Sequence, residues 1–504
     1  MGRRRIAVAA LALFTSCAPR KPPDPQLLTL AIDVGPSSLD PRLGSDESSR
    51  RAHELIYNSL LRYDDQGNPV GDLAERWEHP DPLRYIFHLR DGVRFHRGRP
   101  LTSEDVRYTF ESILNDEVPS FRKGDFQMIA ALQTPDPRTV VFVLKEPFSP
   151  FLANLSLGIL PRGAGPTAGR HPEGTGPFRF VEEHRDQELV LDANDSYFRG
   201  KPAFRRLRLK VVPEAVSRQQ ELLKGSVDLV VNDLTPDQVQ TLRRSPDLVV
   251  ETSPSNSSAY VGFNLQDPIL KDVRVRQAIA FALDREKIIR LLLHGLARLS
   301  TGLLPPQSWA YEPQVQAYGQ DLARSRMLLD ASGHPDPDGK GPRPRFTLTF
   351  KTSTDGLAKE QASVFQEQLE RVGIGLEIRS FEWGTFYDDI KAGRFQMFSL
   401  QWTQLLDPDA LRMRFGSAYF PPHGFNRVRY VNAEVDRLLG VGSQEENRDE
   451  RRKAYARIQQ ILAEELPYVY LWHKSNVAVR RARVQNFALT SSADFYVLER
   501  VTLR

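Results

Sequence analysis

The chain has almost no cysteine: Cys17 is the only one among its 504 residues. A single thiol cannot form an internal disulfide, and it offers no cluster of thiolates for a zinc or iron–sulfur site. Long apolar runs are also missing, since no segment after the N-terminus approaches the 18 consecutive apolar residues of a membrane-spanning helix. These absences exclude a disulfide-stapled scaffold, a thiolate metal centre and a bundle of membrane-spanning helices.

Neither sign of charge is in strong excess. The 68 Lys and Arg residues face 64 Asp and Glu residues, and three of the basic residues are the arginines at positions 3–5. Without those three the positive excess falls to one, so the chain lacks the basic balance of a nucleic-acid-binding protein. Hydrophobic residues make up 40% and charged residues 26%, as in ordinary soluble globular proteins, and the length predicts two or three domains.

Motifs of enzymes and metal sites are absent as well. The sequence has no HExxH pair, no Gly-Lys-Ser/Thr phosphate loop and no Gly-x-Ser-x-Gly nucleophile elbow. His88 and His96 are eight residues apart around a predicted turn and could face one another, but exposed strand positions explain them better than a metal does. We therefore predict no cofactor and no metal, and the sequence makes no positive case for an enzyme.

The first 17 residues have the pattern of an export signal. The arginines at positions 3–5 precede nine apolar residues, 6–14, which are too few to span a bilayer as a helix. The segment ends in Thr-Ser-Cys, which resembles the bacterial lipobox, although Phe14 stands where that motif usually has Leu. We predict a signal peptide over 1–17, lipid attachment at Cys17 and a Pro-rich tether over 18–25. A plain signal peptide with a chance cysteine is the alternative.

A candidate ligand edge lies at residues 395–409. The pattern predicts a buried strand that ends in Trp402, then a polar loop with Thr403, Gln404 and a stiff Asp-Pro-Asp that begins at Asp407. Trp402 would cover an apolar face of a ligand, and Thr403 and Gln404 would supply hydrogen bonds. Asp407 would either bind the ligand or cap the loop. The alternative is a core tryptophan followed by an ordinary turn.

The residues before this edge predict an α/β unit. Strands are expected at 346–350 and 374–380, with helices at 357–372 and 383–392, so the order up to 402 is β-α-β-α-β. Ligands of open α/β sheets lie beyond the carboxyl ends of the strands. Further strands are predicted at 27–33, 84–89, 93–96, 227–231, 468–472 and 477–480, and further helices at 46–61, 102–115, 214–224, 273–283, 433–439 and 448–464.

Ordered motifs along the chain resemble those of family 5 extracellular solute-binding proteins, the peptide/nickel-type receptors of ATP-driven (ABC) importers. The first are LAERW at 73–77, YIFHLRDGVRFH at 85–96 and GRPLTSEDV at 98–106. Later ones are GTGPF at 174–178, NDSYF at 194–198, LKGSVD at 223–228, FN at 263–264, DVRVRQA at 272–278, ALDREK at 282–287 and VGI at 372–374. The resemblance covers nearly all of the chain after the signal.

The resemblance implies an α/β fold of the periplasmic-binding-protein type, with two lobes, an additional domain and a discontinuous first domain. We expect domain I over 26–49, 173–265 and 485–504, domain II over 50–172 and domain III over 266–484. The crossings near 174–176 and 262–264 would lie beside hinges, where glycine tolerates the backbone changes of closure, or would be ordinary turns.

The resemblance also implies the function. It predicts a periplasmic or cell-surface receptor, anchored to the membrane by its N-terminal lipid and monomeric, which passes a peptide or other small solute to the membrane subunits of an ABC importer. Tyr260, just before the second crossing, is a weaker ligand candidate whose alternative is a core position, and Trp383 is predicted to be a packing residue. The alternatives are a secreted or anchored hydrolase, and a receptor of the same fold for a sugar or a metal chelate.

One departure from the family bears on the ligand. Peptide-binding relatives commonly place an Asp, which pairs with the peptide α-amino group, three residues after the tryptophan that corresponds to Trp402; here Leu405 stands there. Dipeptide-binding members use an Arg after the strand at 346–350 for the carboxylate, and here only Lys351 could substitute, without a bidentate fork. An α-ammonium buried without a counter-charge costs on the order of kilocalories per mole. A sugar, a chelate or another small solute therefore stays open beside a peptide.

Overall fold

The structure is a computed structural model that describes residues 24–339 and 341–504. The predicted signal peptide, Cys17 and most of the predicted tether lie outside these residues. Within them, none of the helices combines the length and the apolar character needed to cross a membrane.

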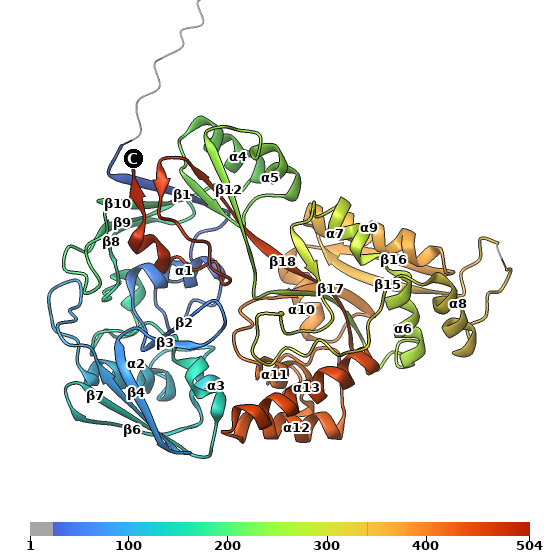
Figure 1. The fold of residues 1–504 in the computed structure, drawn as a ribbon, viewed down its shortest axis with the longest axis horizontal. Coiled ribbons are helices and arrows are strands. Elements are labelled where there is room, and N and C mark those ends of the chain that lie inside the picture. Colours follow the sequence, from blue (N-terminus) through green and yellow to red (C-terminus); the bar gives the residue numbers. More distant parts are fainter. Residues whose placement is uncertain (1–23, 340) are drawn as a thin grey trace, which may run out of the picture.

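A mixed sheet of twelve strands runs through most of the molecule (Figure 1). Its main path has the order β16-β15-β17-β13-β18-β11-β1-β10-β9-β8, and β12 and β14 also pair with β18. The bounds are β1 Leu27–Ile32, β8 Phe178–His184, β9 Glu188–Ala193, β10 Arg206–Val211, β11 Leu229–Val231, β12 Leu248–Pro254, β13 Ser258–Phe263, β14 Ala297–Leu299, β15 Phe346–Ser353, β16 Ile374–Phe381, β17 Met397–Trp402 and β18 Tyr468–Arg481.

The long strand β18 belongs to both halves of this sheet. Its C-terminal part pairs with β11 and β12, and its N-terminal part pairs with β13 and β14. The prediction of two separate strands at 468–472 and 477–480 is wrong, because polar residues between them interrupt the apolar pattern without ending the strand. One of these polar residues, Asn476, is bonded outside the strand: its amide donates to the carbonyls of Thr490 and Ser491, at 2.9 and 2.8 Å.

A smaller antiparallel sheet forms a separate unit, at the lower left of Figure 1. Its order is β4-β5-β7-β6, and it packs with the helices α2 and α3 around its own hydrophobic cluster. The predicted strand at 93–96 is absent, because the segment instead folds back as a loop closed by the hydrogen bond from Phe95 N to Arg99 O, 2.8 Å. The bounds are β2 Leu61–Tyr63, β3 Pro69–Gly71, β4 Ala74–Asp81, β5 Arg84–Leu89, β6 Ile129–Asp136, β7 Thr139–Leu144, α2 Ser103–Leu114 and α3 Lys123–Phe126.

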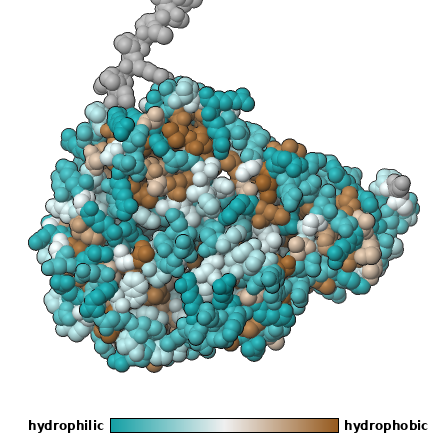
Figure 2. Space-filling model, viewed as in Figure 1, coloured by the Kyte–Doolittle hydropathy of each residue, from teal (hydrophilic) through white to brown (hydrophobic). Residues whose placement is uncertain are grey.

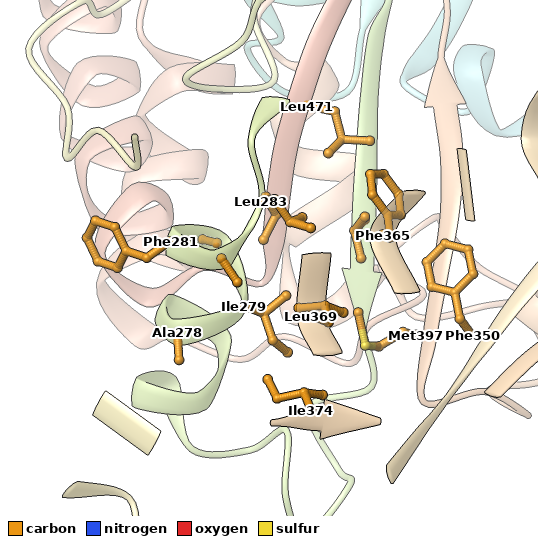
Figure 3. Close-up of a cluster of buried hydrophobic side chains, with 14 of the residues drawn as sticks. Ala278, Ile279, Phe281, Leu283, Phe350, Phe365, Leu369, Ile374, Met397 and Leu471 are labelled. Atoms are coloured by element: carbon orange, nitrogen blue, oxygen red, sulfur yellow. The ribbon is translucent and has the colours of Figure 1, made fainter. Parts of the chain in front are cut away.

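The predicted α/β unit is confirmed. Helices α9, Gly356–Glu370, and α10, Trp383–Lys391, connect β15, β16 and β17, and β15 lies in the middle, parallel to both neighbours. Because all three strands point the same way, their carboxyl ends lie at one edge of the sheet. Figure 3 shows the core on one face, where Ile279 of α6, Val273–Ala282, packs near Leu369 of α9 and Met397 of β17.

Local capping signals in the sequence also place the helix ends. Thr102 forms a capping box with Asp105 at the start of α2, and Gly225 ends α4 with a φ of 78°. The remaining elements are α1 Glu47–Ile56, α4 Ala215–Lys224, α5 Pro236–Leu242, α7 Arg285–Leu291, α8 Leu322–Ala331, α11 Ala410–Phe415, α12 Ala433–Gln444, α13 Arg448–Glu465, β19 Val484–Gln485, β20 Thr502–Leu503, and the 3-10 turns η1 Ser149–Leu155, η2 Ala168–Arg170, η3 Ser417–Tyr419 and η4 Tyr496–Arg500.

Candidate ligand-binding cleft

A cleft of about 1320 Å³ separates two walls of the molecule. One wall comes from residues 41–158, the other from residues 404–444, and residues 492–496 lie between them. The volume exceeds the roughly 300–1,000 Å³ typical of pockets for small ligands. Figure 2 shows a mostly hydrophilic face, with one hydrophobic patch near the top and smaller hydrophobic groups elsewhere.

The cleft lining combines aromatic and charged side chains. Phe121 on one wall is 58% exposed and Phe425 on the other is 41% exposed, so both walls present an aromatic ring to the cleft. Both signs of charge are present. The charged lining residues are Arg50, Glu54, Arg62, Asp72, Arg122, Asp125, Glu146, Asp407, Asp409, Arg412, Arg414, Asp436 and Asp494.

The loop after β17 enters the cleft in a fixed conformation. Gln404 has a φ of 55°, a left-handed backbone that is uncommon for a residue with a side chain. The Asp407 side chain accepts a hydrogen bond from Asp409 N, 2.8 Å, and so caps the loop. Gln404 and Asp407 both line the cleft. The loop therefore presents two of the predicted ligand contacts at the carboxyl edge of the sheet.

The other predicted ligand residues are placed differently. Trp402 is 8% exposed and Tyr260 is fully buried, and their rings stack with centroids 5.8 Å apart behind the cleft wall. Thr403 is exposed but is not among the residues that line the cleft. Trp383, predicted to pack, is 55% exposed, although its ring stacks on Tyr387.

Leu405 does not face the ligand space. Its side chain is 2% exposed and lies in a hydrophobic cluster, while its backbone N–H donates to Asn256 O, 3.0 Å. Lys351 is not free either, because its ammonium pairs with Asp389. Leu405 is thus a core residue of this protein. The carboxylates that a ligand could reach on this wall lie further along the loop.

Asp407 is an incompletely paired carboxylate. Burial raises its pKa to about 6, and the nearby Arg451, 3.7 Å away, only partly offsets this effect. The Tyr63 hydroxyl of the opposite wall is buried without a hydrogen-bond partner, and the Asp407 charge contributes to raising the pKa of that hydroxyl. By contrast, Asp409 accepts a two-pronged ion pair from Arg412, at 2.7 and 2.9 Å. Of these two loop carboxylates, Asp407 is therefore the one that still has capacity for a cation.

A second charged network lies at the base of the cleft. Arg50 of α1 binds Glu54 and reaches Asp494 at 2.9 Å, and Glu54 accepts a hydrogen bond from Phe495 N, 2.6 Å. Burial raises the pKa of Glu54, and the Arg50 charge opposes that rise. These charges satisfy one another and join α1 to the C-terminal segment.

The two walls touch at the rim of the cleft. Ser149 Oγ donates to Glu445 O, 2.5 Å, and Arg448 Nη2 donates to Asn68 Oδ1, 3.3 Å. In the loop between β2 and β3, a Cβ added at Gly67 would lie 2.8 Å from Leu406 O of the other wall. The structure therefore has its walls drawn together. The glycines at the predicted first crossing serve close packing, since a Cβ at Gly174 would meet Ile56 O at 2.0 Å.

Sequence reasoning missed most of the lining residues, including Phe121 and Phe425, and above all Arg414. The sequence carried one usable signal, an arginine-rich run in LRMRF at 411–415 directly after the predicted ligand loop. Which arginines have carboxylate partners depends on residues distant in the chain, and the sequence does not show those pairs.

Two walls with separate hydrophobic cores enclose one large cleft, which is the arrangement of a ligand-binding protein. Residues 68–419 match the family described as bacterial extracellular solute-binding proteins, family 5, and the chain belongs to that family. The predicted fold class is confirmed: an α/β, two-lobe fold of the periplasmic-binding-protein type. The family is one of binding proteins rather than enzymes.

Known relatives span almost the whole chain. The oligopeptide-binding protein AppA of Bacillus subtilis (strain 168) is 28% identical over 488 residues, 92% of this chain and 89% of the relative. A probable di/tripeptide-binding protein 5 of Pseudomonas aeruginosa (strain UCBPP-PA14) is 29% identical over 518 residues, 96% of this chain and 97% of the relative. The solved structure of the Bacillus subtilis AppA in complex with a nonapeptide is similar with a TM-score of 0.82 at 27% identity, covering 95% of this chain and 100% of that one.

Proposed function

We propose that the protein is the exported receptor of an ABC importer, and that it captures a peptide in its cleft and passes it to the importer's membrane subunits. The observation that carries this proposal is the cleft itself, about 1320 Å³ with both signs of charge and exposed aromatic rings on opposite walls. A zwitterionic chain of several residues matches that lining better than a small neutral solute does. The names of the two relatives support the same ligand class.

Within the cleft, Asp407 takes the role of acceptor for the peptide α-ammonium, and Gln404 hydrogen-bonds to the peptide. The incomplete pairing of Asp407 supports this assignment. Trp402 and Tyr260 pack behind the loop, and Thr403 is a residue of the loop that does not line the cleft. Leu405 does not count against a peptide, since its side chain belongs to the core.

We also propose the overall organisation predicted from the sequence. Domain I, over 26–49, 173–265 and 485–504, connects domain II, 50–172, to domain III, 266–484, and the ligand bridges domains II and III so that the closed state binds it better. The protein acts as a monomer without catalytic activity, at the periplasmic side or the cell surface. Cys17 carries the lipid anchor, so a Cys17→Ala variant should be released from membranes, as fractionation and blotting would show.

Native mass spectrometry of the purified protein tests the proposed function. We expect adducts whose masses correspond to peptides, released intact on denaturation. In a thermal shift assay, pooled alanine-based peptides of two to six residues should raise the melting temperature in proportion to the logarithm of peptide concentration. If no adducts are found and no pool shifts the melting temperature, the peptide assignment is overturned. Recovery of cleaved peptides would point to a hydrolase.

A further inference from the structure

Two arginines are stacked on the tryptophan behind the ligand loop. Arg414 Cζ lies 4.2 Å and Arg427 Cζ 4.4 Å from the centre of the Trp402 ring. Both are also near the ring of Phe425, at 5.9 and 5.7 Å. Arg414 and Phe425 line the cleft, and Arg427 lies behind them with 4% of its surface exposed. Guanidinium groups stacked on aromatic rings are held in a fixed orientation.

Neither guanidinium forms an ion pair with a carboxylate of residues 24–339 or 341–504. Arg427 donates to the hydroxyls of Tyr387, 2.7 Å, and Tyr260, 3.4 Å, which are neutral groups. Arg414 donates through Nη1 to Ala410 O, 2.8 Å, while its Nε is buried without a partner.

The surroundings of the pair leave its charge uncompensated. The indole Nε1–H of Trp402 is likewise buried, and it has no hydrogen-bond partner among the described residues. Asp409 exerts an attraction on Arg414, but its oxygens are occupied by Arg412. Burial and the charge of Arg427 lower the pKa of Arg414 to about 10, so both side chains remain charged at neutral pH.

Removing an unpaired charge from water costs several kilocalories per mole, so a guanidinium group held away from water is usually paired with a carboxylate or bonded to several carbonyls. Arg414 lines the cleft without a carboxylate partner among the described residues, and Arg427 lies behind it, which indicates that the counter-charge arrives with the ligand. We propose that Arg414 binds a carboxylate of the ligand, with Trp402 holding its guanidinium in place and Arg427 adding positive potential from behind. This inference rests on the proposed function and deepens it, since it requires the captured ligand to carry a negative group beside this wall.

The planar fork of a guanidinium fits the two oxygens of a carboxylate. In a peptide that group is either the C-terminus or an acidic side chain, and both sources offer the same chemistry. The carboxylate position is thus on the loop and helix after β17, whereas the strand end at Lys351, whose charge is already paired, is not used.

Matched peptides separate the two sources. Binding of Ala-Ala-Ala and its C-terminal amide, and of the amides of Ala-Glu-Ala and Ala-Gln-Ala, would be measured by isothermal titration calorimetry. We expect the wild-type protein to favour the carboxylate form in at least one pair by roughly 10- to 100-fold. Arg414→Met, which keeps the side-chain length, should abolish that preference while binding the peptides that lack a carboxylate as before, and Arg414→Lys should restore part of the preference.

Arg122→Met is the matched control, because Arg122 lines the opposite wall but already has Asp125 at 3.3 Å and Asn154 O at 3.0 Å as partners. It should leave the preference unchanged. Equal binding within both pairs, or a preference that survives Arg414→Met, would overturn the carboxylate site while leaving the receptor function intact. No binding of any of the four peptides by the wild-type protein would count against the proposed peptide ligand, and the carboxylate site would fall with it.

Discussion

Trp402 contacts Tyr260 on one side and two guanidinium groups on the others, with 8% of its surface exposed. We expect Trp402→Ala to lower the free energy of unfolding by about 3–5 kcal/mol in the ligand-free protein, because it opens a cavity in a packed cluster. Urea unfolding would measure this loss. Trp383→Ala, at a site 55% exposed, should change it by about 0.5 kcal/mol or less. An unchanged stability of Trp402→Ala without ligand would instead mean that the ring serves the ligand alone.

Replacing Asp407 should have opposite effects on peptide binding and on the stability of the ligand-free protein. Its pKa in the folded protein is about 6, above the usual value of a carboxyl group, so its charge destabilises the folded state once the pH exceeds that value. Asp407→Asn should therefore raise the stability of the ligand-free protein at pH 7.5, by on the order of 1 kcal/mol. The same change should weaken the binding of a peptide with a free amino group.

The pH dependence of peptide affinity provides the check. Only ionised Asp407 can pair with an ammonium group, so wild-type affinity should fall about tenfold from pH 7.5 to pH 5, as the carboxylate takes up a proton. In Asp407→Asn this dependence should vanish. Asp436→Asn is the control, because Asp436 lines the cleft but already accepts hydrogen bonds from Ser417, at 2.9 and 2.7 Å. A wild-type affinity independent of pH over this range would rule out Asp407 as the ammonium acceptor.

Residue types and spacing could predict Gln404 and Asp407 as lining residues, because both lie in the loop that follows a strand ending at the ligand edge. The same reasoning could not distinguish the inward-facing Trp402 and Leu405 from exposed residues of the same loop. Their positions depend on Tyr260 and Asn256, which are about 150 residues earlier in the chain. The arginine pair escaped prediction for the same reason.

Among the elements, the loop between β2 and β3 closely approaches the other wall. A Cβ at Gly67, where φ is 77°, would meet the Leu406 carbonyl at 2.8 Å. We expect Gly67→Ala to weaken peptide binding about tenfold or more, because the walls can no longer close fully, a loss of about 1.4 kcal/mol.

Gly92→Ala is its matched control, since Gly92 has a φ of 72° and nothing within 4 Å of an added Cβ. Both variants carry the same backbone strain, about 1 kcal/mol, so their stabilities without ligand should be similar. Calorimetric titration of a bound peptide would compare them. Equal affinities of the two variants would show that this approach of the walls has no part in closure.

The regular elements followed their local sequence signals more closely than the site did. The helices and strands from β15 to β17 were predicted within a few residues, because apolar periodicity and caps act locally. The segment at 93–96 and the long β18 were not, since the first folds back on itself and the polar middle of the second depends on partners such as Thr490. Strand formation is decided by neighbours that the local sequence does not contain.

For the whole molecule, the resemblance of ordered motifs to one family predicted the architecture correctly, whereas composition alone predicted only a globular protein of several domains. The family fixes the two walls and the cleft between them. The particular charges in that cleft became visible only when distant segments were placed together. The ligand of this protein is therefore best sought through the charges of Asp407 and Arg414, because family membership alone does not specify it.

The strand β18 has a consequence for how the molecule unfolds. Because it pairs with β11 and β12 at one end and with β13 and β14 at the other, neither half of the large sheet can lose it without exposing an edge of the other half. The two halves therefore unfold as one cooperative unit. The four-stranded sheet β4-β5-β7-β6 has its own core, so its separate unfolding would remove one wall of the cleft and leave the other wall folded.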